Sequence, residues 1–144
     1  MSSSKTYDVF LTYHDKDIGK SFASDLYSSF THAGCLVYIN NNNLTSVDHT
    51  NSSVLQAIQE SRISVIIFSS NFDASTWFLE EMEKILECGR TIGHVVVPVS
   101  YDVLLFHLRQ QKGVFACLKD KSMRYRAVLF EVTSMSGFCI RGSR

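Results

Sequence analysis

A glutamate near the middle of the chain is the residue whose type and position most favour chemistry. Residues 75–88, STWFLEEMEKILEC, have the spacing of an amphipathic helix, with apolar side chains recurring every three or four positions. Glu80 falls on the polar face of this helix, whereas Glu81 falls on the seam beside Trp77, one turn earlier. A carboxylate at the rim of a core is partly desolvated, which can tune its reactivity. The plainer interpretation is a boundary residue whose carboxylate reaches water.

Several other chemistries have no signature in the sequence. The glycine patterns of dinucleotide-binding folds and P-loops are missing after the first apolar run, and no GxSxG motif marks a serine nucleophile. Residues 14–17, HDKD, offer possible metal ligands on one loop. Three ligands this close rarely reach one metal without partners elsewhere, so we expect a solvated turn there and no metal site.

The composition indicates one domain of ordinary globular character. The chain has 144 residues, and its 14 basic residues balance 14 acidic ones. Without a basic field, binding to nucleic acid is not expected. No apolar run approaches the ~18 residues of a membrane span, so no membrane contact is expected either. The four cysteines are widely spaced, which favours buried thiols, a reducing compartment and a cytoplasmic location.

Apolar runs alternate with helical patterns along the chain, which predicts a parallel sheet built from right-handed βαβ units. The expected strands are 7–13, 35–39, 63–68 and 95–99, and the expected helices are 17–33, 53–60, 75–88, 104–118 and 124–135. The run 63–68, ISVIIF, is nearly all apolar, as in a central strand buried on both faces. A fifth strand cannot be located from the pattern.

Two local features refine this prediction. Pro98 lacks a donor for a strand ladder, which places the strand 95–99 toward the edge of the sheet. The four asparagines at 40–43 predict a turn after the second strand. Parallel sheets bind ligands at the carboxyl ends of their strands, near a topological switch point. Glu81, in the first turns of its helix, would face that edge.

The segments that carry a family resemblance are spread over most of the chain. They are YDVFLTY at 7–13, FASDLY at 22–27, VLQAIQESRISVIIFSSNF at 54–72, WFLEEMEKILEC at 77–88 and VVVPVSYDV at 95–103. Together they resemble a plant TIR (Toll/interleukin-1 receptor) domain, of the kind found in nucleotide-binding leucine-rich-repeat immune receptors and in TIR-only proteins. Residues 124–138, RYRAVLFEVTSMSGF, look like the family's last helix.

The resemblance implies a flavodoxin-like, three-layer α/β domain with a central parallel sheet of about five strands flanked by helices. It implies a single domain over residues 7–140, preceded by a flexible N-terminus at 1–6 and followed by a tail at 141–144. It also implies plant innate-immune signalling, in which the domain associates with itself and with other TIR domains. The family's Ser-His pair, used in one self-association face, is Ser24-Asp25 here.

The resemblance further implies hydrolysis of the nicotinamide glycosidic bond of NAD+ or NADP+, without a prosthetic group. Glu81 matches the catalytic glutamate of the family's W-C-L-D-E-L motif. The chemistry is compatible with one carboxylate, because nicotinamide leaves as a neutral base and needs no general acid. A single anion can stabilise the oxocarbenium-like ribose.

Further site residues follow from the same resemblance, and several depart from the family's pattern. Thr12 and His14 are expected to line the pocket, with His14 where the family has an arginine. Asp15 replaces a flexible glycine, and Asn40 opens a second loop that lacks the family's glycine and most of its charges. Loss of a cationic clamp on a phosphate would remove about 1.5–3 kcal/mol per charged hydrogen bond.

The departures leave two functional hypotheses open. Trp77 either packs beside the pocket or simply anchors the start of its helix in the core, and Phe78 replaces the smaller motif cysteine. The altered loops favour a non-catalytic TIR module that only associates with other TIR domains, and helix spacing alone could retain Glu81. The family match favours an NAD+ nucleosidase.

Overall fold

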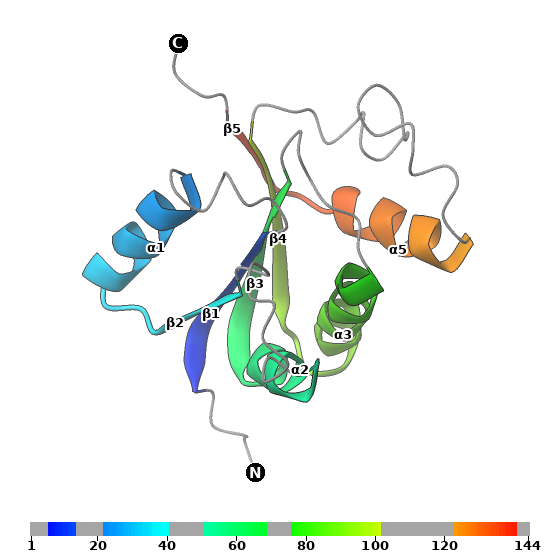
Figure 1. Ribbon diagram of the computed structural model, residues 1–144, viewed down its shortest axis with the longest axis horizontal. Coiled ribbons are helices and arrows are strands. Elements are labelled where there is room, and N and C mark those ends of the chain that lie inside the picture. The colour runs from blue at the N-terminus through cyan, green and yellow to red at the C-terminus, as the bar shows by residue number, and fades with distance from the viewer. Residues whose placement is uncertain (1–5, 14–21, 41–50, 69–75, 102–122, 141–144) are drawn as a thin grey trace.

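The chain folds around one parallel sheet, seen in this computed structural model (Figure 1), which describes residues 6–13, 22–40, 51–68, 76–101 and 123–140. Within these residues the sheet has five strands in the order β2-β1-β3-β4-β5. They are β1 (Tyr7–Tyr13), β2 (Val37–Asn40), β3 (Ser61–Phe68), β4 (Val95–Tyr101) and β5 (Phe138–Ile140). Every adjacent pair is parallel, and this order is that of flavodoxin-like folds.

Helices cover both faces of the sheet. The described helices are α1 (Phe22–His32), α2 (Asn51–Gln59), α3 (Thr76–Thr91) and α5 (Met123–Thr133). Figure 1 shows α1 on one face and the other three helices on the opposite face, and a separate hydrophobic core lies on each side. The predicted three-layer α/β fold class is confirmed.

Successive side chains of β1 point to opposite faces of the sheet, and this determines which of them face α3. Val9, Leu11 and Tyr13 enter the core beneath α1. Phe10 enters the core that the strands share with α2, α3 and α5. Thr12 lies two positions after Phe10, so it faces the same side, and it is fully buried. The carboxyl end of β1 therefore presents a hydroxyl to α3.

The predicted strands are present, and their ends differ from the prediction by at most two residues: β2 spans Val37–Asn40 and β4 continues to Tyr101. The first strand has the predicted bounds, and β3 begins two residues earlier than predicted, at Ser61. Asn40 is the last residue of β2 and is 1% exposed, so the prediction that it opens a turn is wrong. Its pairing with Thr12 in the ladder outweighs the turn preference of asparagine.

The structure contains a fifth strand, β5, which the sequence pattern does not locate. It follows α5, so the helix that resembles the family's last helix is not the final element described. A strand of three residues is too short to show a period of two. The strand that contains Pro98, β4, lies one position in from the edge, which corrects its predicted place. Pro98 precedes the part of β4 that pairs with β5. A Cβ at Gly137 would lie 2.0 Å from the Pro98 carbonyl oxygen, so this approach requires glycine.

The described helix ends agree with the sequence pattern within a few residues, and the predicted first turn of the first helix, at 17–21, lies outside the described residues. The prediction at 75–88 corresponds to α3, which continues to Thr91, and the prediction at 124–135 corresponds to α5. The predicted helix at 104–118 lies outside the described residues. Of the two cysteines whose side chains the structure describes, Cys88 is buried as expected, whereas Cys35 is only partly buried; both are thiols.

Candidate active site

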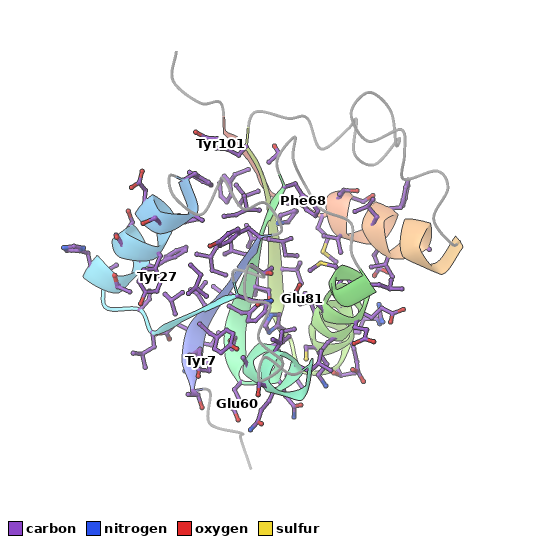
Figure 2. All side chains as sticks on the ribbon, viewed as in Figure 1. Tyr7, Tyr27, Glu60, Phe68, Glu81 and Tyr101 are labelled. Atoms are coloured by element: carbon purple, nitrogen blue, oxygen red, sulfur yellow. The ribbon has the colours of Figure 1, made fainter. Side chains whose placement is uncertain are left out.

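Glu81 lies in the second turn of α3 and reaches toward the sheet (Figure 2). The residue is 3% exposed. The interpretation of Glu81 as a boundary residue whose carboxylate reaches water is therefore wrong. Its neighbour Glu80 is exposed on the outer face of the helix, as its spacing predicted.

Two donors from neighbouring strands hold the Glu81 carboxylate. The Thr12 hydroxyl donates to Oε2 at 2.8 Å, and the Asn40 side-chain amide donates to the same oxygen. Thr12 and Asn40 are partners in the parallel ladder of β1 and β2, so their side chains leave the sheet side by side. We call Thr12, Asn40 and Glu81 the carboxyl-end cluster. Hydrogen bonds to a charged group contribute about 1.5–3 kcal/mol each, which offsets part of the cost of burying the carboxylate.

An aromatic layer lies directly beneath this cluster. Phe10 and Tyr38 are the preceding ladder pair on the same face, and their rings stack at 5.7 Å with an interplanar angle of 13°. Tyr7 meets Tyr38 edge-on at 5.4 Å. Burial raises the pKa of the Tyr38 phenol, and the negative fields of Tyr7 and Glu81 raise it further. The rings close the floor of the site, so a ligand would approach Glu81 from the carboxyl ends of β1 and β2.

Several of the other predicted site residues lie wholly or partly outside the part of the chain that the structure describes. His14 and Asp15 lie outside the described residues. Trp77 and Phe78 lie in the first turn of α3, but their side chains are outside the described part. Of the predicted pocket residues, the structure thus brings together Thr12, Asn40 and Glu81.

The predicted self-association residues lie on the other side of the sheet from Glu81. Ser24 and Asp25 are both exposed on α1, the helix that covers the opposite face (Figure 1). Tyr27, on the same helix, is also exposed. A contact between copies through α1 would therefore leave the carboxyl-end cluster uncovered.

A second buried polar cluster lies at the opposite ends of the strands, and sequence reasoning missed it. His94 is 6% exposed; its Nδ1 lies 3.0 Å from the Ser61 carbonyl oxygen and its Nε2 lies 2.6 Å from Ser64 Oγ. A carbonyl only accepts, so Nδ1 carries the hydrogen, and in the neutral imidazole the Ser64 hydroxyl donates to Nε2. We call Ser61, Ser64 and His94 the amino-end cluster.

The end of α3 places His94 in this cluster. The His94 backbone N–H donates to the Cys88 carbonyl at 3.2 Å, and Gly93 has a φ of +72°. Glycine readily takes this left-handed backbone conformation, and the turn there brings His94 back beneath the end of the helix. The signal that could have found the cluster is Ser64 itself, because a hydroxyl inside an apolar strand requires a buried partner.

Ser64 and His94 are in contact, as a serine nucleophile and its general base would be. A substrate, however, could not reach Ser64. Ser64 is 0% exposed in the interior of β3, with neighbouring strands on both sides. A nucleophile must meet its substrate, so we interpret this pair as structural.

Ser100 contrasts with Ser64 on the neighbouring strand. It lies on β4 and is 0% exposed. Its hydroxyl has no hydrogen-bond partner in the part of the chain that the structure describes. Its strand, like β3, is paired on both sides, so the backbone around both serines is similar.

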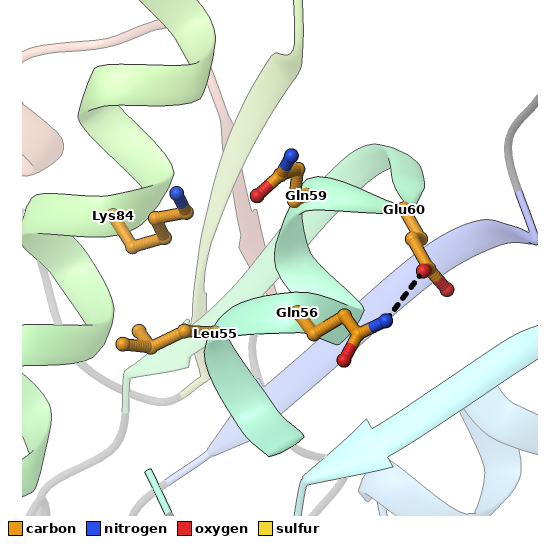
Figure 3. A pocket seen from close by; sticks show the side chains of 5 residues that line it. All are labelled: Leu55, Gln56, Gln59, Glu60 and Lys84. Atoms are coloured by element: carbon orange, nitrogen blue, oxygen red, sulfur yellow. Dashed lines mark hydrogen bonds between the residues drawn. The ribbon is translucent and has the colours of Figure 1, made fainter. Parts of the chain in front are cut away.

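A groove of about 430 Å³ lies between α2 and α3, away from Glu81 (Figure 3). It is lined by Leu55, Gln56, Gln59, Glu60 and Lys84. Gln56 donates to the Glu60 carboxylate at 2.9 Å, and this hydrogen bond, with a second from Thr6, lowers the pKa of Glu60. The groove is open to solvent, and it shares no residue with the carboxyl-end cluster. Within the described ranges, no group of three His, Cys, Asp or Glu side chains could hold a metal ion.

The sequence matches the family model of the TIR domain over residues 6–127. The chain belongs to the TIR domain family. The TIR domain is 37% identical to disease resistance protein RPV1 of Vitis rotundifolia, over 96% of this chain and 10% of that protein. It is 32% identical to TMV resistance protein N of Nicotiana glutinosa, over 96% of this chain and 13% of that protein. This TIR domain therefore spans about a tenth of the length of these curated relatives.

Solved structures agree with this assignment. The TIR domains of the activated Roq1 resistosome, which recognises the pathogen effector XopQ, superpose with a TM-score of 0.79 at 34% identity, covering 93% of this chain and 87% of that one. The RPS4 and RRS1 TIR heterodimer gives a TM-score of 0.53 at 22% identity, covering 88% and 93%, and supports the fold alone. Among the helices described for this TIR domain, none is long and apolar enough to cross a membrane.

Proposed function

We propose that this TIR domain hydrolyses the nicotinamide glycosidic bond of NAD+ or NADP+ and that Glu81 is the catalytic carboxylate. The observation that carries the proposal is a buried carboxylate held by Thr12 and Asn40 at the carboxyl ends of β1 and β2. Parallel sheets bind ligands at this edge. A buried charge is costly unless paired, so its presence there favours a use in chemistry over a use in stability.

The reaction needs only groups of this kind. The bond between the ribose anomeric carbon and the nicotinamide nitrogen breaks, and the electron pair leaves with nicotinamide, which becomes neutral. Positive charge develops on the ribose, where the Glu81 carboxylate stabilises it. Water then adds to the anomeric carbon and releases a proton, giving ADP-ribose (or its phosphorylated form) and nicotinamide. The proposed reaction requires no prosthetic group.

The biological setting of the proposal is plant immune signalling in the cytoplasm. The relatives are disease resistance proteins, and the Roq1 TIR domains belong to an activated assembly. By this analogy the domain would associate with itself and with other TIR domains. The exposed Ser24 and Asp25 on α1 are the proposed contact residues. Sedimentation of Asp25→His beside the parent tests this face, and unchanged association would exclude it.

Nicotinamide release from NAD+ and from NADP+ by concentrated protein tests the activity. We expect release by the parent, and a rate about 100- to 1,000-fold lower for Glu81→Ala. Glu80→Ala is the matched control, because it removes the adjacent carboxylate from the exposed face. No release by the parent at any concentration would refute the activity, and equal release by Glu81→Ala would refute the residue assignment.

The second candidate function is a TIR module that only associates. The low exposure of Glu81 favours it, because a carboxylate that is 3% exposed can also serve as a structural link between helix and sheet. Association without nicotinamide release, measured on the same samples, would favour this module. Release that grows with association would favour the nucleosidase.

A further inference from the structure

We infer that Thr12 and Asn40 are positioning residues that orient Glu81, and that they do not bind the dinucleotide themselves. This inference rests on the proposed function for its kinetic part. The observation that carries it is that both side chains donate to one oxygen, Oε2 of Glu81. A hydrogen donated to the carboxylate cannot at the same time be donated to a substrate.

The two donors restrict the carboxylate because they come from rigid elements. Thr12 is the next-to-last residue of β1, Asn40 is the last residue of β2, and the two are direct ladder partners. Both are essentially buried, at 0% and 1% exposure. Two donors converging on one oxygen oppose rotation of the carboxyl group, and donors on strands hold a geometry better than donors on loops. The strand ends thus set the direction in which Glu81 faces an incoming ribose.

The chemistry of Thr12 supports a role through Glu81. A threonine hydroxyl has one hydrogen to donate, and here it is given to Oε2. Thr12 is fully buried, so no part of its surface is offered to a large ligand. The loss of this hydroxyl should therefore slow the reaction without weakening the binding of substrate.

Kinetics separate the two roles. Thr12→Val keeps the shape and removes the hydroxyl, and Asn40→Leu removes the amide at similar size. We expect each to lower kcat about tenfold or more while KM stays within about threefold, since an interaction that acts in the transition state affects kcat. Thr12→Ser, which keeps a hydroxyl, should recover most of kcat. A rise in KM at unchanged kcat would overturn the inference, because it would mark a substrate contact.

Stability gives a readout that does not depend on activity. Thr12→Val should lower the urea midpoint of the parent but change it little in a Glu81→Ala background, where the acceptor is gone. Asn40→Leu is the second variant should Thr12→Val fail to fold. Equal shifts in both backgrounds would show that Thr12 does not act through Glu81 and would overturn the inference. A parent that releases no nicotinamide would refute the proposed function alone, because the midpoints still decide whether the two residues hold Glu81.

Discussion

The carboxyl-end and amino-end clusters are two buried polar groups on the same face of the same sheet, at opposite ends of its strands. Each ties the region of α3 to the sheet: Glu81 near the start of the helix, and His94 just past its end. In each, hydrogen bonds across elements bring polar groups together. They differ in their central group, because one contains a carboxylate and the other an imidazole.

This difference favours a stabilising role for the amino-end cluster and the proposed catalytic role for the carboxyl-end cluster. In the amino-end cluster, both ring nitrogens of His94 have hydrogen-bond partners, so these bonds contribute to stability. In the carboxyl-end cluster, the cost of desolvating Glu81 consumes much of what its hydrogen bonds contribute. A fold that needed only a link at this position could use a neutral residue. The retained charge therefore favours chemistry.

The largest expected contrast is between alanine variants of the two clusters. Glu81→Ala should lower nicotinamide release by about 100- to 1,000-fold, whereas His94→Ala should change the rate per folded molecule less than about twofold. Release is measured well below the unfolding temperature of each variant. A loss of activity in folded His94→Ala would break the comparison.

Stability should show the reverse order. His94→Ala removes two buried hydrogen bonds and leaves a small cavity, so we expect a loss of about 2–4 kcal/mol, or roughly 6–12 °C in the melting temperature. Glu81→Gln keeps the shape and an acceptor oxygen while removing the charge, so its unfolding free energy should stay within about 1 kcal/mol of the parent. Urea unfolding measures both. A greater loss in Glu81→Gln than in His94→Ala would contradict this view.

Alanine variants of two buried serines, Ser64 and Ser100, extend the comparison of stability. Ser64→Ala leaves His94 Nε2 without its partner and should cost about 1–2 kcal/mol. Ser100→Ala removes a buried hydroxyl that has no partner among the described residues, so it should be neutral or stabilising by up to about 1 kcal/mol. Equal costs for the two variants would show that the Ser64 contact contributes little beyond packing.

The smallest effect concerns Tyr38, which senses the charge of Glu81. Burial raises its phenol pKa above the ordinary tyrosine value of 10.0, so the folded state holds this proton more tightly than the unfolded state. That contribution to stability is complete below pH 10 and is lost as the pH rises through the folded pKa. Tyr38→Phe should therefore lose stability less steeply than the parent above pH 10.

The pKa of the Tyr38 phenol also tests whether Glu81 is a source of the negative field that raises it. Glu81→Gln should lower the pKa of Tyr38, because a negative field is removed, and the phenolate absorbance should rise at lower pH. The difference from Tyr38→Phe identifies the signal of this tyrosine. His94→Gln is the control, since replacing a neutral imidazole should leave the titration unchanged. An equal shift in both variants would show that Tyr38 reports general loosening of the fold.

The alternation of apolar runs and helical patterns was enough to predict the layers of the fold. It also placed Glu81 at the correct edge of the sheet. The burial of Glu81 could not be predicted, because its donors Thr12 and Asn40 lie 69 and 41 positions away in the sequence. Local spacing describes one helix, whereas burial depends on which strand ends lie opposite it.

The amino-end cluster shows the same limit in another way. His94 carries no motif, since its partners are a backbone carbonyl 33 positions upstream and a serine hydroxyl 30 positions upstream. Asn40 was assigned to a turn because its neighbours are also asparagines, whose turn preference is strong. Pairing with β1 extended the strand by the one residue that reaches Glu81.

The two anchored ends of α3 have a consequence for changes in its length. An α-helix turns by about 100° per residue, so inserting or deleting one residue between Glu81 and Cys88 would rotate one end relative to the other. His94 could then keep its hydrogen bonds in the amino-end cluster only if Glu81 lost its hydrogen bonds to Thr12 and Asn40. Such a variant would preserve composition, charge and helix propensity, yet it would separate the carboxylate from the strand ends. The number of residues in this helix is thus as much a part of the site as the identity of Glu81.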